Sequence, residues 1–499
     1  MARSGIQSDT QVVRLVLPQR RELFYGGGWY APREGGRTSV FNPATCVVLT
    51  EVADASARDV DLAVTAAREA FASWRQTEPR ERAKRLREIA GLIRQHAGEL
   101  ALLDAVDSGN PVREMLADVE NSAHQLEFFA GLVTEMKGST IPMGPNALNF
   151  SVREPRGVIA RVLPFNHPLM FFAGKTAALL AAGNTVVVKP AEQTPLSALR
   201  LMELAGHVLP PGVLNVLTGG GEMAGYLAKH PDVAMIALIG SVASGRSVMH
   251  AAADTIKPVL LELGGKNALV AFPDADVDEV AQAAVAGMNF AWCGQSCGST
   301  SRAFLHERTH DAVLERIRKR VAHYQPGDPS DPATTMGAIV SRNQYERVLG
   351  HIDLARAEGA RLVHGGGRPP GVPEGRGWFI EPTVFADVTP QMTIAREEVF
   401  GPVLAVLRWS DRNEMISAVN AVEYGLTCSI WTDDLENAHR TAQSVQAGFV
   451  WINEVAKHFL GAPFGGFKQS GLGREECLEE LIAYTQEKNI HVRLRRTDG

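Results

Sequence analysis

The chain has 499 residues, of which 45% are hydrophobic and 21% charged, values typical of a globular protein of about three domains. Its net charge of -6 argues against a nucleic-acid partner, because nucleic-acid binding requires a basic face. Residues 1–19 lack the apolar core of a secretory signal, no run approaches a membrane span, and the five scattered cysteines fit reduced thiols, so we expect a cytoplasmic protein without a membrane partner.

The first third of the chain predicts an irregular arm followed by helices. The segment up to about Tyr25 shows no periodicity, and we expect a mobile arm there. Ser56 and Asp59 have the spacing of a capping box, and the apolar residues after them recur at helical spacing to residue 74. A second long helix is expected from Pro79 to about Gly109, because glycine and the proline that soon follows it end helices.

The middle third alternates short apolar runs with helical patterns. Strands are expected at residues 158–163, 185–188, 213–217, 235–238 and 259–262, and helices at 170–182, 196–208, 222–229 and 244–253. Each connection is long enough for the next strand to return parallel. The predicted fold class is therefore α/β, with an open, doubly wound sheet.

Candidate ligand-binding residues follow the carboxyl ends of these strands, where sheets of this kind bind ligands. They are Asn166, Lys189, Gly219, Ser241 and Glu262. A second alternating series follows, with strands expected at residues 268–272, 300–305, 403–407 and 428–431, and it includes Cys297. The glycine- and proline-rich residues 365–373 predict a loop. The pattern indicates a second α/β domain.

Cys297 lies among glycine and small residues, where a carbonyl compound can approach a thiol closely. Three further motifs accompany it: PFNHPL at 164–169, LELGGKN at 261–267 and EEVFGP at 397–402. In this order and at this spacing they resemble the NAD(P)-dependent aldehyde dehydrogenase superfamily, from about residue 20 to about residue 490. The glycine-rich residues 463–475 also match that family and are expected to form a mostly structural loop.

The resemblance implies two doubly wound, Rossmann-like α/β domains (the aldehyde dehydrogenase fold) plus a small β oligomerisation hairpin. The expected NAD-binding domain comprises residues 1–137 and 153–261, the catalytic domain residues 262–460, and the oligomerisation or bridging segments residues 138–152 and 476–499. In the family the hairpin pairs with the C-terminal strand of another subunit, here about residues 490–495, although the sequence alone equally allows a plain surface hairpin. A homo-oligomer, either a dimer or a tetramer, is expected.

The cofactor site shows two glycine-rich motifs. Residues 219–224 fit the dinucleotide fingerprint, a weak signal, and residues 240–247 differ from a P-loop only at Arg246. No metal-binding acid follows, which favours pyrophosphate binding over phosphoryl transfer. Val242 stands where the family has threonine. Glu192 favours NAD over NADP because a carboxylate repels a 2′-phosphate, and a solvated loop acid is an equal alternative for this residue. The family match assigns the cofactor to Phe165, Lys189, Glu192, Gly221, Gly225, Gly240, Ser241, Gly245, Leu263, Glu398 and Phe400.

The implied mechanism is covalent. Cys297 attacks the aldehyde as a thiolate, the Asn166 amide and the Cys297 backbone N–H stabilise the oxyanion, and hydride transfer to the nicotinamide leaves a thioester. Glu262 then activates the hydrolytic water, and Lys175 tunes the local charge. Simpler alternatives remain: Asn166 as a helix cap, and Glu262 in a surface ion pair with Lys266.

Cys293 lies four residues before Cys297 and suggests half of a metal site, but no second ligand pair matches, so no metal is expected. A reversible disulfide between the two cysteines is the preferred interpretation.

Glu262 also bears on the choice of reaction, because many CoA-acylating relatives lack a general base at this position. The alternatives kept open are therefore a CoA-acylating semialdehyde dehydrogenase and a non-catalytic structural relative on the same scaffold.

The substrate tunnel of the family implies a further set of residues, several of them aromatic. They are His167, Met170, Phe171, Gly174, Trp292, Ser296, Gly298, His458, Phe459 and Phe464. Several relatives have a bulky aromatic residue where this chain has Gly174, so we expect a wider entrance. No arginine, and no lysine other than Lys175, stands at these positions to face a carboxylate. The expected substrate is an aromatic or otherwise bulky apolar aldehyde, oxidised to the carboxylic acid.

Overall fold

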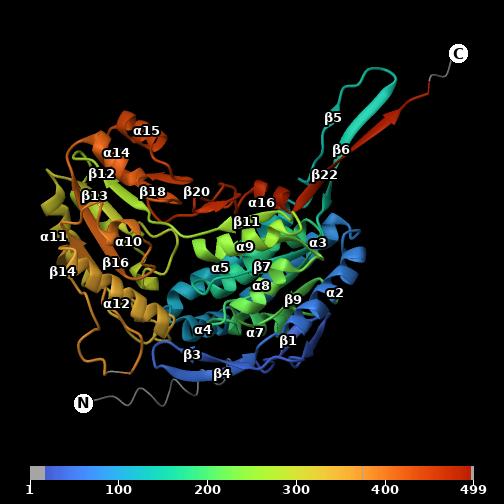
Figure 1. Cartoon of the computed structure of the whole chain (residues 1–499), viewed down its shortest axis with the longest axis horizontal. Helices are drawn as coiled ribbons and strands as arrows, with labels where there is room; N and C mark the ends of the chain where they lie inside the picture. The colour runs from blue at the N-terminus through green and yellow to red at the C-terminus, as the bar shows by residue number, and fades with distance from the viewer. Residues whose placement is uncertain (1–16, 374, 496–499) are drawn as a thin grey trace.

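The computed structural model describes residues 17–373 and 375–495 and shows two large sheets, each with helices on both faces, and a projecting arm (Figure 1). The predicted α/β fold class is confirmed. The expected N-terminal arm lies outside the described residues up to residue 16, and its last part was predicted wrongly, because Leu23–Tyr25 is a strand of the first sheet. Within the described ranges, no helix combines the length and hydropathy needed to cross a bilayer.

The first sheet has eight strands in the order β2-β1-β9-β8-β7-β10-β11-β21, and its five central strands are parallel. These five are the strands expected from the sequence: β7 (Val158–Val162), β8 (Thr185–Lys189), β9 (Leu214–Val216), β10 (Val233–Ile239) and β11 (Val259–Glu262). The antiparallel edges are β1 (Leu23–Tyr25), β2 (Gly28–Tyr30) and β21 (Gly471–Leu472). Chain order reverses between β7 and β10, which creates the switch point at which such sheets bind ligands.

Helices bury both faces of this sheet. One face is covered by α3 (Pro79–Gln95), α4 (Ala97–Ser108), α5 (Val112–Gly131), the π-helical turn η1 (Met170–Gly174), α6 (Lys175–Ala181) and α7 (Leu196–Ala205). The other face is covered by α2 (Ala57–Trp74), α8 (Gly221–Lys229) and α9 (Val242–Ala253). Successive residues of β7 point to opposite faces, so Ile159 joins the first core and Ala160 the second.

The helix boundaries follow local chemistry. Ser56 and Asp59 form the predicted capping box, because each side chain accepts a hydrogen bond from the other residue's backbone N–H. The second long helix, by contrast, is broken: His96 leaves the helical conformation with φ -109° and ψ 22°, so α3 and α4 are separate. Gly109 ends α4 as expected, with φ 84°, in the left-handed conformation that glycine adopts without strain.

The second sheet has seven strands in the order β14-β15-β16-β13-β12-β18-β19, of which only β14 is antiparallel to its neighbour. Its strands are β12 (Ala268–Ala271), β13 (Arg302–His306), β14 (Arg361–His364), β15 (Thr383–Ala386), β16 (Val403–Trp409), β18 (Thr427–Trp431) and β19 (Phe449–Ile452). Its helices are α10 (Val277–Gly287), α11 (His310–Val321), α12 (Arg342–Ala357), α13 (Thr393–Arg396), α14 (Arg412–Asn420) and α15 (Leu435–Ser444). The predicted strands are confirmed, whereas β14, β15 and β19 were missed.

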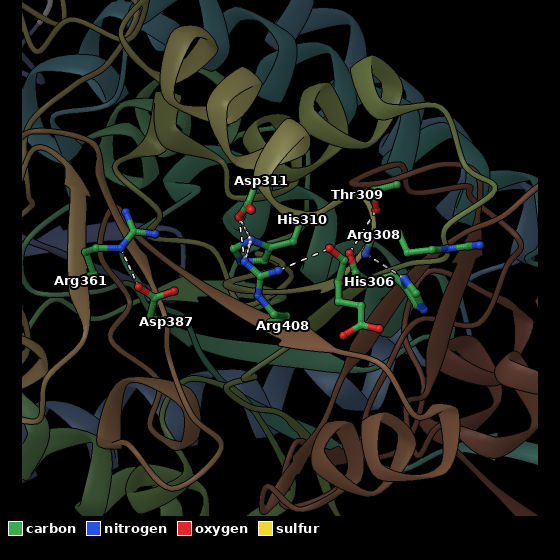
Figure 2. A network of polar contacts seen from close by, with 9 residues as sticks. His306, Arg308, Thr309, His310, Asp311, Arg361, Asp387 and Arg408 are labelled. Carbon is green, nitrogen blue, oxygen red and sulfur yellow. Dashed lines mark hydrogen bonds and ion pairs between the residues drawn. The ribbon is translucent and has the colours of Figure 1, made fainter.

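Polar contacts join β16 to α11, and a separate ion pair joins β14 to the residue after β15 (Figure 2). Arg408 of β16 donates to Asp311 at 2.7 Å and lies 2.9 Å from Nδ1 of the fully buried His310. Arg361 of β14 donates to Asp387 at 2.6 Å, just after β15. Exposed ion pairs of this kind contribute about 0–1 kcal/mol each, so the network orients these elements more than it stabilises them.

The arm is a three-stranded sheet in the order β22-β6-β5 that projects from the body of the molecule (Figure 1). It comprises β5 (Thr140–Ile141), β6 (Ala147–Pro155) and β22 (Thr485–Arg493), the last of which follows α16 (Leu478–Ala483). β22 pairs with β6 of the same chain over its whole length. The expected pairing of this C-terminal strand with another subunit's hairpin is therefore wrong, because α16 returns the chain beside its own hairpin. Two small sheets, β3 (Arg37–Asn42) with β4 (Val47–Ala53) and β17 (Tyr424–Gly425) with β20 (Phe467–Lys468), complete the fold.

Candidate active site

The two sheets meet edge to edge at the candidate site. Glu262 is the last residue of β11, and only residues 263–267 separate it from β12. Cys297 precedes β13, so it lies at the amino edge of the second sheet. Cys297 and Glu262 line the same cavity of about 680 Å³. The structure therefore brings a thiol and a carboxylate from different sheets to one space.

Asn267 anchors the backbone of the loop that carries Cys297. The Asn267 amide nitrogen donates to the carbonyl oxygens of Cys297, at 2.6 Å, and Ser299, at 3.0 Å. Its Oδ1 accepts from the Thr427 N–H at 3.0 Å. The loop begins at Cys293, which has φ 54° and is buried in the core of the second sheet instead of facing the cavity. All five cysteines are free thiols.

Burial and the nearby Glu262 carboxyl raise the pKa of the Cys297 thiol to about 12. Because a thiolate would sit among carboxyl groups in a desolvated site, this raised pKa favours the thiol over the thiolate before attack. A nucleophile in this state needs a base that removes its proton during attack.

Glu262 has the properties of such a base. Its side chain is 3% exposed, and among the described residues neither carboxyl oxygen has a hydrogen-bond partner. Burial raises its pKa well above the usual range, and the neighbouring Glu475 raises it further, whereas Lys175 opposes the rise. The alternative of a surface ion pair with Lys266 is wrong, because Lys266 is 1% exposed and its Nζ also has no partner in the described residues.

Lys175 belongs to a buried ionic cluster behind Glu262. Its Nζ lies 3.0 Å from Glu475 Oε2 and 3.1 Å from Glu476 Oε1. Arg161 donates to Glu475 Oε1 at 2.8 Å. These two carboxylates raise the pKa of Lys175, despite burial, and keep it charged. The cluster therefore places a fixed positive charge close enough to act on Glu262.

Asn166 is buried at 3% exposure in the loop between β7 and η1. Its carbonyl oxygen accepts from the Asn110 side chain at 2.9 Å, and no described residue binds its Oδ1. Asn166 itself is not part of the wall of the 680 Å³ cavity, whereas the next residue, His167, is. The side-chain oxygen of Asn166 thus has no partner in the described residues, whereas its backbone is anchored by Asn110.

The predicted cofactor residues lie between the two sheets. Phe165 and Glu192 line a second cavity of about 1100 Å³, opposite helix α12. Phe165 lies edge-on to Phe400 with ring centroids 5.6 Å apart. Glu398 Oε1 accepts from the Gly265 N–H at 2.9 Å, which positions the EEVFGP loop beside the Glu262 strand.

Glycine allows the close approaches that a dinucleotide site needs. A Cβ at Gly245 would lie 2.6 Å from the Leu263 side chain, so only glycine lets α9 pack this closely. Helix α8 begins after Gly220 without a side-chain cap, which leaves its first N–H groups available to an anion. Ser241 caps α9 by accepting from the Ser244 N–H at 3.1 Å, so its hydroxyl is shared between the helix and any phosphate.

The remaining predicted cofactor residues lie at strand ends, in a helix or in a loop. Lys189 ends β8, Gly221 and Gly225 belong to α8 after β9, Gly240 follows β10, Leu263 follows β11, and Phe400 lies in the EEVFGP loop. Lys189 donates to the Pro190 carbonyl at 3.2 Å. Burial lowers the pKa of Lys189.

All the predicted substrate residues except Gly174 line the 680 Å³ cavity: His167, Met170, Phe171, Trp292, Ser296, Gly298, His458, Phe459 and Phe464. The prediction for Gly174 is wrong. A Cβ on Gly174 would lie 2.3 Å from Gln125 Oε1, so the space left by the missing ring is filled by Gln125 of α5 and does not widen the entrance. Lys457 is a further cation in the wall that the sequence analysis did not include.

Comparison with known proteins agrees with this geometry. Residues 29–490 match the model of the aldehyde dehydrogenase family. The chain belongs to the aldehyde dehydrogenase family. Aldehyde dehydrogenase tropH of Talaromyces stipitatus is 51% identical over 487 residues, which cover 96% of this chain and 94% of that protein.

Solved aldehyde dehydrogenases share the fold closely. The NAD+ complex of aldehyde dehydrogenase from Bacillus cereus superimposes with a TM-score of 0.93 at 37% identity, over 99% of each chain. A mutant of the P. syringae indole-3-acetaldehyde dehydrogenase AldA, in complex with NAD+ and IAA, superimposes with a TM-score of 0.94 at 36% identity, over 98% of this chain and 99% of that one.

For this aldehyde dehydrogenase, sequence reasoning missed residues that reach the site from distant elements. Gln125 and Asp118 come from α5, which was not predicted, and Glu475 and Glu476 come from the loop after β21. Asn267 was inside a recognised motif but had no assigned role. Its three hydrogen bonds, to backbone groups of the Cys297 loop and of β18, depend on the fold, so the local sequence gave no signal for this role.

Proposed function

We propose that this aldehyde dehydrogenase oxidises aromatic aldehydes to carboxylic acids with NAD, through a covalent intermediate on Cys297. The observation that carries the proposal is that Cys297 and Glu262 line one cavity whose wall contains Phe171, Trp292 and Phe464. The P. syringae relative, crystallised with NAD+ and IAA, supports an aromatic substrate and this cofactor.

In the first step the Cys297 sulfur forms a bond to the aldehyde carbon while its proton passes to the Glu262 carboxylate. The raised pKa of Glu262 makes its carboxylate a stronger proton acceptor than an ordinary carboxylate, which assists this transfer. The carbonyl oxygen becomes an oxyanion, for which we assign the Asn166 amide and the Cys297 backbone N–H as donors. Losing one such donor lowers kcat by about 10²–10³ in other enzymes.

The residues between the two sheets fit a dinucleotide. The uncapped start of α8 suits a pyrophosphate, Glu398 and Phe400 border the nicotinamide end, and Glu192 suits a free ribose 2′-hydroxyl. When bound, NAD accepts the hydride that leaves the substrate carbon, so that the C=O bond reforms as a thioester on Cys297.

Glu262 acts again in the second half of the reaction, after it has released to solvent the proton that it took from Cys297. It removes a proton from water, whose oxygen bonds to the thioester carbon. The C–S bond then breaks, the sulfur recovers a proton, and the carboxylic acid leaves. The positive charge of Lys175 partly offsets the negative charge of the carboxyl groups around Glu262. A general base at this position favours hydrolysis over transfer to CoA.

Substitution of Glu262 by glutamine tests this proposal. Mixed with NAD and benzaldehyde, Glu262→Gln is expected to release at most about one equivalent of NADH per site and then turn over slowly, whereas Cys297→Ser releases none. Wild-type turnover that requires CoA would instead establish the acylating alternative. Full activity of Cys297→Ser would contradict covalent catalysis, and a kcat/KM with NADP equal to that with NAD would contradict the cofactor preference.

We also propose that the chain is a cytoplasmic homo-oligomer, a dimer or a homotetramer, with its domain boundary at Glu262 and its bridging segments in the arm. The arm supports this because it exposes the apolar side chains of Ile141, Met143, Leu148 and Val492, and because β5 and β22 are edge strands of its sheet within the described residues. Light scattering of the purified protein measures the assembly directly, and a monomer at micromolar concentration would contradict it.

A further inference from the structure

Helix α5 presents a polar stripe to the substrate cavity. Glu114, Asp118, Asn121 and Gln125 recur at intervals of three or four residues, and all of them line the 680 Å³ cavity. The same cavity is also lined by aromatic side chains, among them Phe171 of the neighbouring η1 turn. A cavity lined by both polar and aromatic side chains does not suit the purely apolar substrate expected from the sequence, because such a substrate would leave the polar side chains unpaired and dehydrated.

Gln125 is the most deeply buried amide of this stripe, at 5% exposure. Its Oε1 rests on the bare backbone of Gly174 and, among the described residues, has no hydrogen-bond partner. Its Nε2 lies farther from the position of a Gly174 Cβ, at 3.2 Å, which leaves the amide nitrogen as the end turned away from η1. Because Gln125 belongs to the cavity wall and its oxygen is packed against Gly174, the amide nitrogen is the end of the side chain that can donate a hydrogen bond to a ligand.

A second polar group stands farther along the same wall. His167 Nδ1 lies 2.7 Å from Asp118 Oδ2, so the carboxylate orients the imidazole and leaves Nε2 for another partner. The ring of His167 is edge-on to Phe171 and to Trp292, at centroid distances of 5.2 and 5.4 Å. The Trp292 indole N–H also has no partner in the described part of the chain. Hydrogen-bonding groups therefore border the space in which an aromatic ring would lie.

The charge of the wall restricts the polar substituent that it accepts. Carboxyl groups in the wall outnumber its two lysines: Glu114, Asp118, Glu262, Glu475 and Glu476 stand against Lys175 and Lys457. Lys175 is already paired with two of these carboxylates, and Lys457 with Glu454 outside the cavity. An anionic substituent would be repelled, whereas a neutral hydroxyl both donates and accepts hydrogen bonds.

We propose that Gln125, seated on Gly174, is a specificity-determining residue that hydrogen-bonds a hydroxyl group on the ring of an aromatic aldehyde. The inference rests on the proposed function and narrows its substrate class to hydroxylated aromatic aldehydes. Gly174 and Gln125 act as one unit, because any side chain at position 174 takes the space of the amide.

The test compares kcat/KM for 2-, 3- and 4-hydroxybenzaldehyde with kcat/KM for benzaldehyde, all with NAD. In the wild type, the best hydroxylated isomer is expected to exceed benzaldehyde. Gln125→Met keeps the length of the side chain without its hydrogen bonds, and the hydroxylated-to-plain ratio should fall about ten-fold. Gln95→Leu, at an exposed glutamine that ends α3, is the matched control and should keep the wild-type ratio.

Gly174→Ala tests the same contact by changing Gly174 instead of Gln125, because the added methyl group would displace the Gln125 amide. The ratio of kcat/KM for the hydroxylated aldehyde to kcat/KM for benzaldehyde should fall in this variant. In the double variant with Gln125→Met, this ratio should fall no further than in Gln125→Met alone. An unchanged ratio in Gln125→Met, or strictly additive losses in the double variant, would overturn the inference. A wild type that forms no NADH with any of these aldehydes would instead refute the proposed function, so the two failures are distinguishable.

Discussion

Replacing Asn267 by alanine should loosen the nucleophile loop without touching the substrate. The substitution removes three hydrogen bonds. It leaves the Cys297 carbonyl oxygen and the Thr427 N–H without a partner among the described residues, whereas the Ser299 carbonyl still accepts from the Ser301 N–H at 2.9 Å. Asn267 is 3% exposed, so water replaces these bonds poorly. At about 1–2 kcal/mol for each of the two unpaired groups and about 1 kcal/mol for the third bond, the free energy of unfolding should fall by about 3–5 kcal/mol.

Two measurements separate stability from positioning in this variant. Urea denaturation gives the free energy of unfolding, and alkylation by iodoacetamide gives the reactivity of Cys297 in the folded enzyme. Asn420→Ala is the matched control, because Asn420 also bonds two backbone groups of its domain, Ser444 O at 2.9 Å and Gln446 N at 2.8 Å. We expect both variants to lose stability and only Asn267→Ala to lose kcat. If kcat and thiol reactivity of Asn267→Ala matched those of the control, the positioning argument would be refuted.

Two further predictions concern Glu262 and its strand. Because Lys175 lowers the pKa of Glu262, Lys175→Met should raise that pKa and move the acid limb of the kcat-pH profile to higher pH; a limb that stays in place or moves to lower pH would contradict the assigned cause. Gly471→Ala should destabilise the protein by about 2–4 kcal/mol in urea, because its Cβ would lie 2.1 Å from the Leu261 carbonyl at φ 147°. Gly98→Ala in α4, where a Cβ meets nothing within 4 Å, should be neutral or stabilising, and equal effects of the two alanines would disprove the steric argument.

The parallel core was predictable because it depends on local patterns. Apolar runs of strand length, glycine at strand ends and the capping box at Ser56 each carry their meaning within a few residues. Glu262 and Lys189 end their strands as the sequence pattern predicts, at the edge where parallel sheets of this kind bind ligands. The broken helix at His96 was not predictable, because nothing in the local sequence distinguishes that residue from a helix interior.

The chemistry of the site was less predictable, since it depends on residues brought together by packing. The partners of Lys175 lie some 300 positions later in the chain, at Glu475 and Glu476. The raised pKa of Cys297 follows from burial beside Glu262, which no spacing encodes. Gly174 was read as an opening because the residue that occupies its space, Gln125, belongs to another helix.

The short connection between Glu262 and β12 has a mechanical consequence. Residues 263–267 are the whole link between the last residue of β11 and the first residue of β12, and β21 pairs with β11 beside this link. Because a link this short cannot span a large separation, the two sheets stay close together next to the carboxylate. The link therefore keeps the base near the sheet whose loop carries the nucleophile.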